Sequence, residues 1–561
     1  MSQVFHRGHS DTGTCVEQAI PKEEIGSNGK SSIVSWFLKI ASGTFASRIL
    51  GMVREVVCAI FLGAGSAMDC FLTAFTIPNL FRRVFGEMAM EGAFLPTFNT
   101  FLARGRKKDA WRLASTICNL TALALSALIL LLYFLTPAIV AILAPGYDGQ
   151  LVALTIKLTR LMLPFALFIG LAGFLGSLLL ARKRPMAYSF APILFNVGAI
   201  AGVLVFYESL GIYSLALGIM IGGFGQMVAQ VNGLLFIGDP DAGYRPVIDL
   251  QHPGVRKVLS LAVPVFMTSV VDKLGEVAKR VIASFLVAGS LSAFSFAFRL
   301  ALLPYAVISL AVSRSVLPLL SDVHASNDMD SFRRHLLEGL NLCAFLMIPT
   351  AVGISVLAVP LVETVFAYGA WSTTNPQATI MTSQALIFMA ASLPFMSAVA
   401  ILTRACHAML ETKPPLSAAV RGLIINLVFS FGLAATPLGH TGFAIAIALD
   451  YLAQSAILFG VIKRRLSNDG VCFNYLLLTR SVVKIIIASA VMGLVVWLAS
   501  EHFWQGTAAV AYHRVASLLC LVVGGSVVFG IAALALGIGE MKNLSQFVQR
   551  RFPRPSTKEP K

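Results

Sequence analysis

Residues 45–94, FASRILGMVREVVCAIFLGAGSAMDCFLTAFTIPNLFRRVFGEMAMEGAF, combine two apolar helical runs with many charged side chains. The runs at 45–62 and 70–85 flank a glycine-rich corner at 63–65. Charge falls within or beside both runs, at Arg48, Arg54, Glu55, Asp69, Arg82, Arg83, Glu87 and Glu91. A charged side chain at bilayer depth costs at least about 2.5 kcal/mol, so it normally faces a watery cavity and marks a transport path.

The rest of the chain has the composition of a membrane protein. Of its 561 residues, 57% are hydrophobic and only 12% are charged, and the mean hydropathy is +0.80. A helix needs about 20 apolar residues to cross the hydrocarbon core. Runs of that length occur at about 33–62, 69–101, 113–144, 151–181, 187–207, 211–236, 258–288, 291–320, 336–368, 379–410, 416–436, 440–463, 480–500 and 513–538. The sequence therefore predicts an all-α polytopic membrane protein with about 14 transmembrane helices.

Basic residues gather in every second connection between these runs. The even connections and the last tail hold Arg104, Arg106, Lys107, Lys108, Arg112, Arg182, Lys183, Arg184, Arg245, Arg256, Lys257, Arg333, Arg334, Lys413, Lys463, Arg464, Arg465, Lys542, Arg550, Arg551 and Arg554. Odd connections are short and nearly free of base, with Arg514 as the exception. The positive-inside rule then places both termini in the cytoplasm and explains the net charge of +16 without nucleic acid.

The two halves of the chain resemble each other. Residues 50–66 align without gaps to residues 274–290 and share ten of seventeen positions. Asn196 matches Asn426, and Gln226 matches Gln454. A repeat of about six helices is even-numbered, which predicts two parallel lobes around a central cavity, related by an axis along the membrane normal.

The repeat predicts a division of the chain. The predicted parts are a disordered cytoplasmic tail (1–30), an N-terminal lobe (31–240), a cytoplasmic linker (241–257), a C-terminal lobe (258–466), two extra helices (477–540) and a basic tail (541–561). The tail at 1–30 lacks the apolar core of a signal peptide.

Arginine dominates the predicted cavity. Arg48 and Glu55 are seven residues apart and share one helix face, and Arg54 reaches the same wide cavity. In the second half, Arg299 has no acidic neighbour in its own run. Guanidinium groups bind phosphate oxygens bidentately and stay charged, so a diphosphate ligand fits them. The alternative is that the arginines pair with Glu55, Asp69, Glu87 and Glu91 and only join helices.

Two further groups leave alternatives open. Arg83, Glu87 and Glu91 form one helix stripe, but Arg82 and Arg83 could lie at the cytoplasmic surface instead. Asp272 and Glu276 belong to a charged cluster that is either a solvated helix end or the site of a coupling cation or proton.

The sequence carries no signature of catalysis or of a cofactor. It has no phosphate-binding P-loop, HExxH motif or nucleophile elbow. The eight cysteines form no CxxC pair, so no metal site is expected. These features favour a transporter over an enzyme and leave the membrane potential or a monovalent cation as the energy source.

The motifs SRILGMVRE, GAGSAMDCF, IPNLFRR, EGAFLP, AFRL (297–300), RSVLP (314–318) and TKPP (412–415) resemble the MurJ (MviN) family of lipid II flippases. That family belongs to the multidrug, oligosaccharidyl-lipid and polysaccharide exporters. The resemblance covers the whole chain. It implies translocation of undecaprenyl-diphosphate-linked disaccharide-pentapeptide (lipid II) from the inner to the outer leaflet of the bacterial cytoplasmic membrane, by a monomer that works beside the peptidoglycan synthesis machinery.

The resemblance also implies site residues. The family's essential cavity arginines match Arg48, Arg54 and Arg299, and Asp69 and the pair Arg82/Arg83 match as well. The two extra helices would form a groove for the lipid tail. This chain departs from the family around Arg299, where acidic residues are frequent but Phe298 and Leu302 stand here.

Two other functions remain open on this sequence. One is export of a different undecaprenyl-linked glycan, and the other is a cation-coupled drug antiporter of the same fold. An antiporter cavity would be dominated by carboxylates, whereas arginines dominate here. An intramembrane glycosyltransferase would need a catalytic carboxylate in a sizeable external loop, which the short odd connections disfavour.

Overall fold

A computed structural model describes residues 27–81, 93–235, 243–471, 475–504 and 510–541. Within these ranges the secondary structure is helical and contains no strand, which confirms the all-α prediction. Eleven of the described helical segments are long and apolar enough to span a membrane. The helices α1, α2 and α8, which carry Arg48, Asp69 and Glu276, are not among those eleven. The total of 14 spans stays a prediction.

The first half of the chain contains seven helices in its described part. They are α1 (Ser27–Leu62), α2 (Ser66–Phe81), α3 (Leu95–Ala103), α4 (Lys107–Leu143), α5 (Gly149–Ala181), α6 (Pro185–Leu210) and α7 (Tyr213–Leu235).

The second half begins with α8 (Pro253–Ala283). It continues with α9 (Ser290–Pro304), the π-helical turn η3 (Tyr305–Ser309), α10 (Leu310–Ala325), α11 (Met329–Val356), α12 (Ala358–Val365), α13 (Ala370–Thr374), α14 (Ala378–Ala408), α15 (Lys413–Ala434) and α16 (Thr441–Asn468). The last two helices are α17 (Tyr475–Phe503) and α18 (Ala511–Ala535).

Polar residues at the helix starts explain several of these boundaries. The side chain of Asp148 accepts a hydrogen bond from the backbone N–H of Leu151 at 2.8 Å and so caps α5. Asp328 caps α11 in the same way through Ser331 at 2.9 Å. Such caps satisfy backbone donors that the first helical turn leaves without partners.

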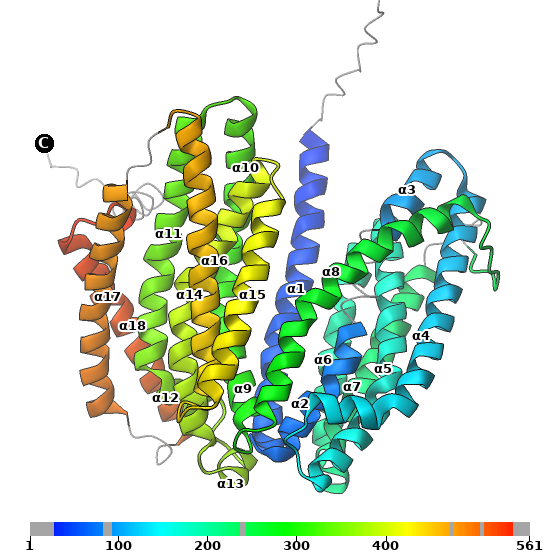
Figure 1. The fold of residues 1–561 in the computed structure, drawn as a ribbon, viewed down its shortest axis with the longest axis horizontal. Coiled ribbons are helices and arrows are strands. Elements are labelled where there is room, and N and C mark those ends of the chain that lie inside the picture. Colours follow the sequence, from blue (N-terminus) through cyan, green and yellow to red (C-terminus); the bar gives the residue numbers. More distant parts are fainter. Residues whose placement is uncertain (1–26, 82–92, 236–242, 472–474, 505–509, 542–561) are drawn as a thin grey trace, which may run out of the picture.

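Helix packing follows the same plan in both halves. In the first, α1 packs on α6, α2 on α5, α5 on α4 and α7, and α6 on α7. In the second, α8 packs on α15, α9 on α14, α14 on α11 and α16, and α15 on α16. In Figure 1 helices α2–α7 and helices α9–α16 form separate groups, with α1 between them and α17 and α18 at the outer edge of the second group. The helix α8 runs from the middle of the molecule to α3 and α4. The two groups have the arrangement expected for a parallel repeat.

Several predicted boundaries are wrong by a few residues or more. The helix α1 begins at Ser27, so residues 27–30 are helical and not part of a disordered tail. The run 336–368 is divided into α11 and α12, and the run 291–320 contains the π turn η3. Both divisions are local changes of backbone hydrogen bonding inside apolar sequence, which hydropathy does not record.

The predicted linker is also shorter than expected, because α8 already begins at Pro253. Residues 243–252 lie along one face of α4 near its start. Asn119 donates to the carbonyl of Val247 at 3.0 Å, and Arg112 forms an ion pair with Asp249 at 2.9 Å. The connection between the halves is therefore fastened to the first half.

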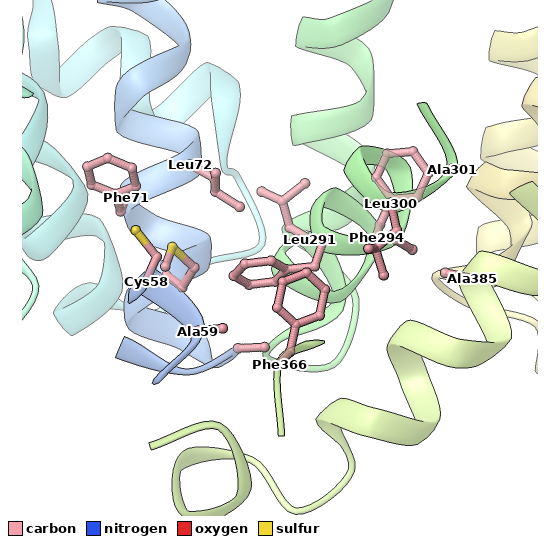
Figure 2. Close-up of a cluster of buried hydrophobic side chains, with 14 of the residues drawn as sticks. Cys58, Ala59, Phe71, Leu72, Leu291, Phe294, Leu300, Ala301, Phe366 and Ala385 are labelled. Carbon is pink, nitrogen blue, oxygen red and sulfur yellow. The ribbon is translucent and has the colours of Figure 1, made fainter. Parts of the chain in front are cut away.

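The two halves meet at the end that carries the odd connections. Buried apolar side chains from both halves join there in one cluster. Figure 2 shows Ala59 and Leu72 of the first half on the side that faces Leu291 and Phe366 of the second. At this end α1 also packs on α13, and α2 packs on α9.

Candidate functional site

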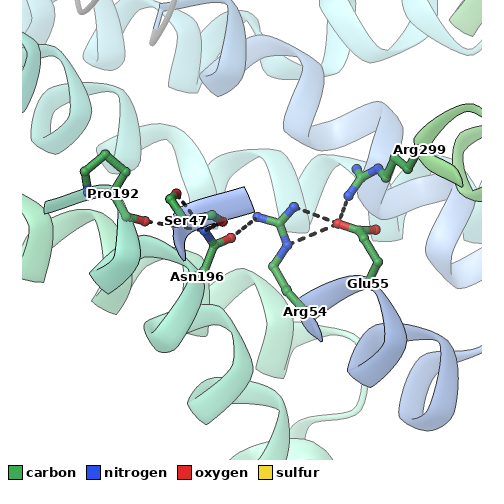
Figure 3. Close-up of polar contacts among 6 residues, drawn as sticks. All are labelled: Ser47, Arg54, Glu55, Pro192, Asn196 and Arg299. Carbon is green, nitrogen blue, oxygen red and sulfur yellow. Dashed lines mark hydrogen bonds and ion pairs between the residues drawn. The ribbon is translucent and has the colours of Figure 1, made fainter. Parts of the chain in front are cut away.

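Glu55 joins one arginine from each half of the molecule (Figure 3). Its Oε1 atom accepts hydrogen bonds from Nη2 and Nε of Arg54, at 2.6 and 3.2 Å. The same oxygen forms an ion pair with Nη1 of Arg299, which α9 contributes. Glu55 is only 7% exposed. A buried carboxylate needs such partners, so the contact fixes α1 against α9 at this point.

Asn196 of α6 orients Arg54 from the other side. Its Oδ1 atom accepts from Nη1 of Arg54 at 3.1 Å, while its Nδ2 donates to the carbonyl of Ser47 at 3.1 Å. The Arg54 guanidinium also lies 5.3 Å from the centre of the Phe195 ring. Arg54 is thus held in one place by carboxylate, amide and aromatic contacts.

Arg48 makes a second contact between the halves. Its Nη1 atom donates to the carbonyl of Ala306 at 3.4 Å. Ala306 belongs to η3, the π turn that follows Pro304. Turns of this kind interrupt regular helical bonding and are frequent at functional sites.

The cluster carries more positive than negative charge. The guanidinium groups of Arg54 and Arg299 share the carboxylate of Glu55, and Arg48 contacts a backbone carbonyl and forms no ion pair among the described residues. The side chain of Arg299 is 36% exposed, and within the described part of the chain its Nε and Nη2 atoms have no partner. A multiply charged anion such as a diphosphate would match this excess through charge-assisted hydrogen bonds.

The structure places Asp69 at the end where the two halves meet, apart from the arginine cluster. Its two carboxylate oxygens accept from the backbone N–H groups of Gly289 and Ser292, both at 2.7 Å. These groups open α9, so an aspartate of α2 caps a helix of the other half. Asp69 therefore links the two halves through hydrogen bonds and does not pair with the arginines of the cluster.

Glycines allow the loops to approach closely beside Asp69. Gly289 has a φ angle of +88°, and a Cβ atom there would lie 2.7 Å from the carbonyl oxygen of Ala64. Asn375 donates to that same oxygen at 3.1 Å. We name the contacts among loops 63–66, 284–290 and 366–378 the seam. Only glycine combines the left-handed backbone with this contact distance.

Some predicted site residues cannot be placed. Arg82, Arg83 and Glu91 lie outside the described residues, and so does the side chain of Asp272. Glu276 is half-buried on α8 and interacts electrostatically with Lys279 and Arg280. A group of three or more histidine, cysteine or acidic residues able to hold a metal does not occur among the side chains that the structure describes.

A second polar cluster occupies the matching place in the second half. Asp450 of α16 accepts from Gln454 at 2.6 Å and from Asn426 at 3.3 Å. Lys279 of α8 interacts with Asp450 electrostatically. In the repeat alignment Lys279 stands where Glu55 stands in the first half. The two halves therefore place opposite charges at equivalent positions.

A family model described as "Lipid II flippase MurJ" matches residues 58–518, which span α1 to α18 and include Asp69 and Arg299. The chain belongs to the MurJ family. The lipid II flippase MurJ of Burkholderia cenocepacia is 30% identical over 503 residues, covering 88% of this chain and 96% of the relative. A probable lipid II flippase MurJ of Haemophilus influenzae is 29% identical, covering 88% and 98%.

Solved structures agree with the MurJ assignment. A lipid II flippase MurJ in an inward closed conformation superposes with a TM-score of 0.73 at 26% identity, covering 92% of this chain and 99% of that one. An inward-facing multidrug transporter of the MATE family and MOP superfamily gives a TM-score of 0.64 at 14% identity, covering 76% and 95%. The second match shows a shared fold alone.

In this MurJ family member, apolar residues stand beside Arg299 in α9, and its counter-charge comes from elsewhere. Phe298 stacks on Phe294, with ring centres 6.1 Å apart, and Leu302 packs on the apolar core. The counter-charge comes instead from Glu55 of the other half.

Sequence reasoning missed two functional candidates in this MurJ family chain. Asn196 was visible only as a repeat match to Asn426, and its contact with Arg54 joins residues 142 positions apart. Asp450 carried a usable signal, because it is an isolated carboxylate inside an apolar run.

Proposed function

We propose that this chain is a flippase that moves lipid II from the inner to the outer leaflet of the bacterial cytoplasmic membrane. Membership of the MurJ family carries the proposal, and the relatives named above are called lipid II flippases. The protein is a multi-pass transporter and not an enzyme. The residues of the candidate site would bind the lipid and take part in its translocation, and they would not make or break covalent bonds.

The arginine cluster would bind the diphosphate of the lipid. Arg299 offers two nitrogens that have no partner in the described part of the chain, and Arg48 is exposed on α1. Arg54 is already held by Glu55 and Asn196, so its role would be to position charge. A diphosphate would compete with Glu55 for Arg299 and would loosen the ion pair between the halves. Ligand binding and movement of the halves would then be coupled.

Alternating access would use the seam as its outer gate. The seam lies at the end with the base-poor odd connections, which the charge rule places outside the cytoplasm. With both termini inside, the end at which the seam joins the halves would be the outer end. Opening the seam while the opposite ends approach each other would expose the arginine cluster to the other side.

An ion gradient or the membrane potential would reset the empty carrier. The positive excess at the cluster responds to the potential if the halves move it through the field, at about 2.3 kcal/mol per charge per 100 mV. A monovalent cation or proton at Asp272 or Glu276 is the alternative that the charge of α8 supports. The carrier would work as a monomer in contact with membrane lipids and beside the peptidoglycan synthesis machinery.

A binding measurement tests the proposed substrate. Purified protein should bind lipid II more tightly than undecaprenyl phosphate, because only lipid II carries a diphosphate and the sugar-peptide head. The Arg299→Ala variant should lose this preference, and Arg104→Ala, which removes an exposed arginine near the start of α4, should keep it. Equal binding of both lipids by the unaltered protein would contradict the proposal.

A further inference from the structure

A proline in α4 leaves one backbone carbonyl without its helical partner. Pro137 lies inside α4 and has no N–H, so the carbonyl of Tyr133, four residues earlier, receives no helical hydrogen bond. Arg160 of α5 takes that place, since its Nε atom donates to the Tyr133 carbonyl at 3.2 Å. Its guanidinium also lies 4.6 Å from the centre of the Tyr133 ring. Arg160 is therefore anchored to α4 through one side of its planar group.

Among the described residues, the outer side of the Arg160 guanidinium has no partner. Neither Arg160 nor Lys157, one turn earlier on α5, forms an ion pair with any carboxylate among the described residues. Asp148, the acidic residue at the start of α5, is engaged in capping that helix. Lys157 is exposed, and Arg160 is partly exposed beside it. Two positive charges thus share one face, and neither has an acidic ion-pair partner among the residues that the structure describes.

This face looks toward lipid rather than toward the other half. On α4, Leu130 and Phe134 beside Tyr133 are 61% and 69% exposed. On α5, Leu161 is 36% exposed. Large apolar side chains exposed on a membrane-spanning helix are covered by acyl chains. The two cations therefore border hydrocarbon, where an uncompensated charge is costly unless it reaches the headgroups.

The depth of the two cations allows that reach. Lys157 and Arg160 lie 8 and 11 residues from the start of α5 at Gly149, which is about 12 and 17 Å along the helix axis. The 33 residues of α5 extend about 50 Å, so roughly 10 Å projects beyond each side of a 30 Å hydrocarbon core. Both side chains can extend toward the phosphates at the Gly149 end, which is the outer leaflet in the proposed orientation.

We infer that Lys157, Arg160 and Tyr133 form a binding site for the phosphate of an anionic phospholipid, such as phosphatidylglycerol, in the outer leaflet. The free side of the Arg160 guanidinium and the Lys157 ammonium would hold the phosphate oxygens. The acyl chains would cover Leu130, Phe134 and Leu161. Such a lipid would join α4 to α5 at the level of Pro137, where α4 lacks a backbone hydrogen bond. The choice of leaflet rests on the proposed orientation, whereas the site itself does not rest on lipid II transport.

Cross-linking in vesicles tests the site. The full-length protein is reconstituted with a photoactivatable phosphatidylglycerol or a photoactivatable phosphatidylcholine, and the cross-linked peptides are mapped. Phosphatidylglycerol should label residues 130–137 and 153–164 in preference to phosphatidylcholine. The double variant Lys157→Gln/Arg160→Gln should reduce that labelling by about tenfold, the effect of losing charge-assisted contacts. Arg104→Gln/Lys108→Gln, which removes two cations at the other end of α4, should leave it unchanged.

A second variant tests the anchor while keeping both charges. Pro137→Ala restores the helical donor to the Tyr133 carbonyl, so Arg160 should lose its fixed position and labelling by phosphatidylglycerol should fall. If the double variant does not fold, Lys157→Gln alone replaces it, because this variant keeps the anchor of Arg160 and should also reduce labelling by phosphatidylglycerol. Equal labelling by the two phospholipids, or retention of labelling in the double variant, would overturn the site. Displacement of phosphatidylglycerol by undecaprenyl diphosphate would show that the site binds the exported lipid, and this result would overturn the inference as well. Arg299→Ala should not affect this labelling, which separates the site from the transport proposal.

Discussion

Glu55 binds two arginines with one carboxylate oxygen, and this makes it the residue on which the cluster depends. The sequence was enough to predict Arg48, Arg54, Glu55 and Arg299, because charges inside apolar runs are costly and easily seen. It did not predict that Glu55 bridges the halves or that Asn196 orients Arg54. Those contacts join residues far apart in the chain, and no periodic pattern records them.

Replacing Glu55 with glutamine should lower the thermal stability of the protein. The change leaves Arg54 and Arg299 without their shared counter-charge, at a cost of about 2 kcal/mol once the partial exposure of Arg299 is considered. Inorganic pyrophosphate should raise the unfolding temperature of the Glu55→Gln variant more than that of the unaltered protein, because it supplies the missing negative charge. Thermal unfolding in detergent measures both effects.

Glu338→Gln is the matched control, since Glu338 is an exposed carboxylate that contacts only His335 among the described residues. Its unfolding temperature should not change, with or without pyrophosphate. If Glu55→Gln behaves like this control, Glu55 does not balance the arginines.

Among the helices, α9 depends on a cap from the other half. Replacing Asp69 with alanine removes two hydrogen bonds from the start of α9, which costs about 1–2 kcal/mol and should open the seam more often. Cys70 follows Asp69 and is fully buried, so it reports this opening. In a variant that retains only Cys70, labelling by an impermeant thiol reagent added outside should increase about tenfold, as a cost of 1.4 kcal/mol implies.

Asp328→Ala provides the control for that experiment, because Asp328 caps α11 within its own half through Ser331. It should lower stability by a similar amount and leave Cys70 protected. Equal labelling of Cys70 in the two variants would mean that Asp69 is an ordinary cap and does not hold the halves together.

The helix α18 is held to α12 by Arg514, the residue that departs from the charge rule. Its Nη1 atom donates to the carbonyls of Glu363 and Ala367, at 3.0 and 3.4 Å. The guanidinium also lies 4.3 Å from the centre of the Tyr368 ring. Arg514 is 6% exposed. Its charge stabilises the carbonyl groups at the end of α12, so it gives no information on which side of the membrane this connection lies.

Replacing Arg514 with alanine should destabilise the protein by roughly 1–3 kcal/mol, since the carbonyls of Glu363 and Ala367 lose a charged donor. Arg480→Ala, on the exposed face of α17, should have little effect. Thermal unfolding of the two variants compares them. Equal unfolding temperatures would show that Arg514 does not fasten α18.

At the level of elements, apolar run length predicted most of the helices, and the alignment of the two halves predicted a repeat of about six helices. It did not predict the π turn η3, the break between α11 and α12, or the attachment of residues 243–252 to α4. Each of these depends on which backbone groups find partners, and hydropathy is insensitive to that. The same reasoning explains Asp69, whose residue type and position were apparent but whose partners at Gly289 and Ser292 were not.

For the whole molecule, the charge rule predicts which end faces the cytoplasm. Cysteine introduced at Gly149, Ser209 or Thr373 should react with an impermeant thiol reagent added to intact cells, and cysteine at Lys107 or Arg464 should not. All five positions are exposed in the structure, so access depends on the side of the membrane alone. The reverse pattern would invert the orientation and would make the seam an inner gate.

The central claim is that the arginines between the halves carry the diphosphate of lipid II across the membrane. The most direct measurement is the amount of lipid II that an impermeant lipid II-cleaving enzyme reaches in cells that depend on this protein. Arg48→Ala, Arg54→Ala and Arg299→Ala should abolish cleavage at normal membrane levels, lysine at these positions should restore it only in part, and Arg104→Ala should leave it intact. Normal cleavage in all three alanine variants would contradict the claim.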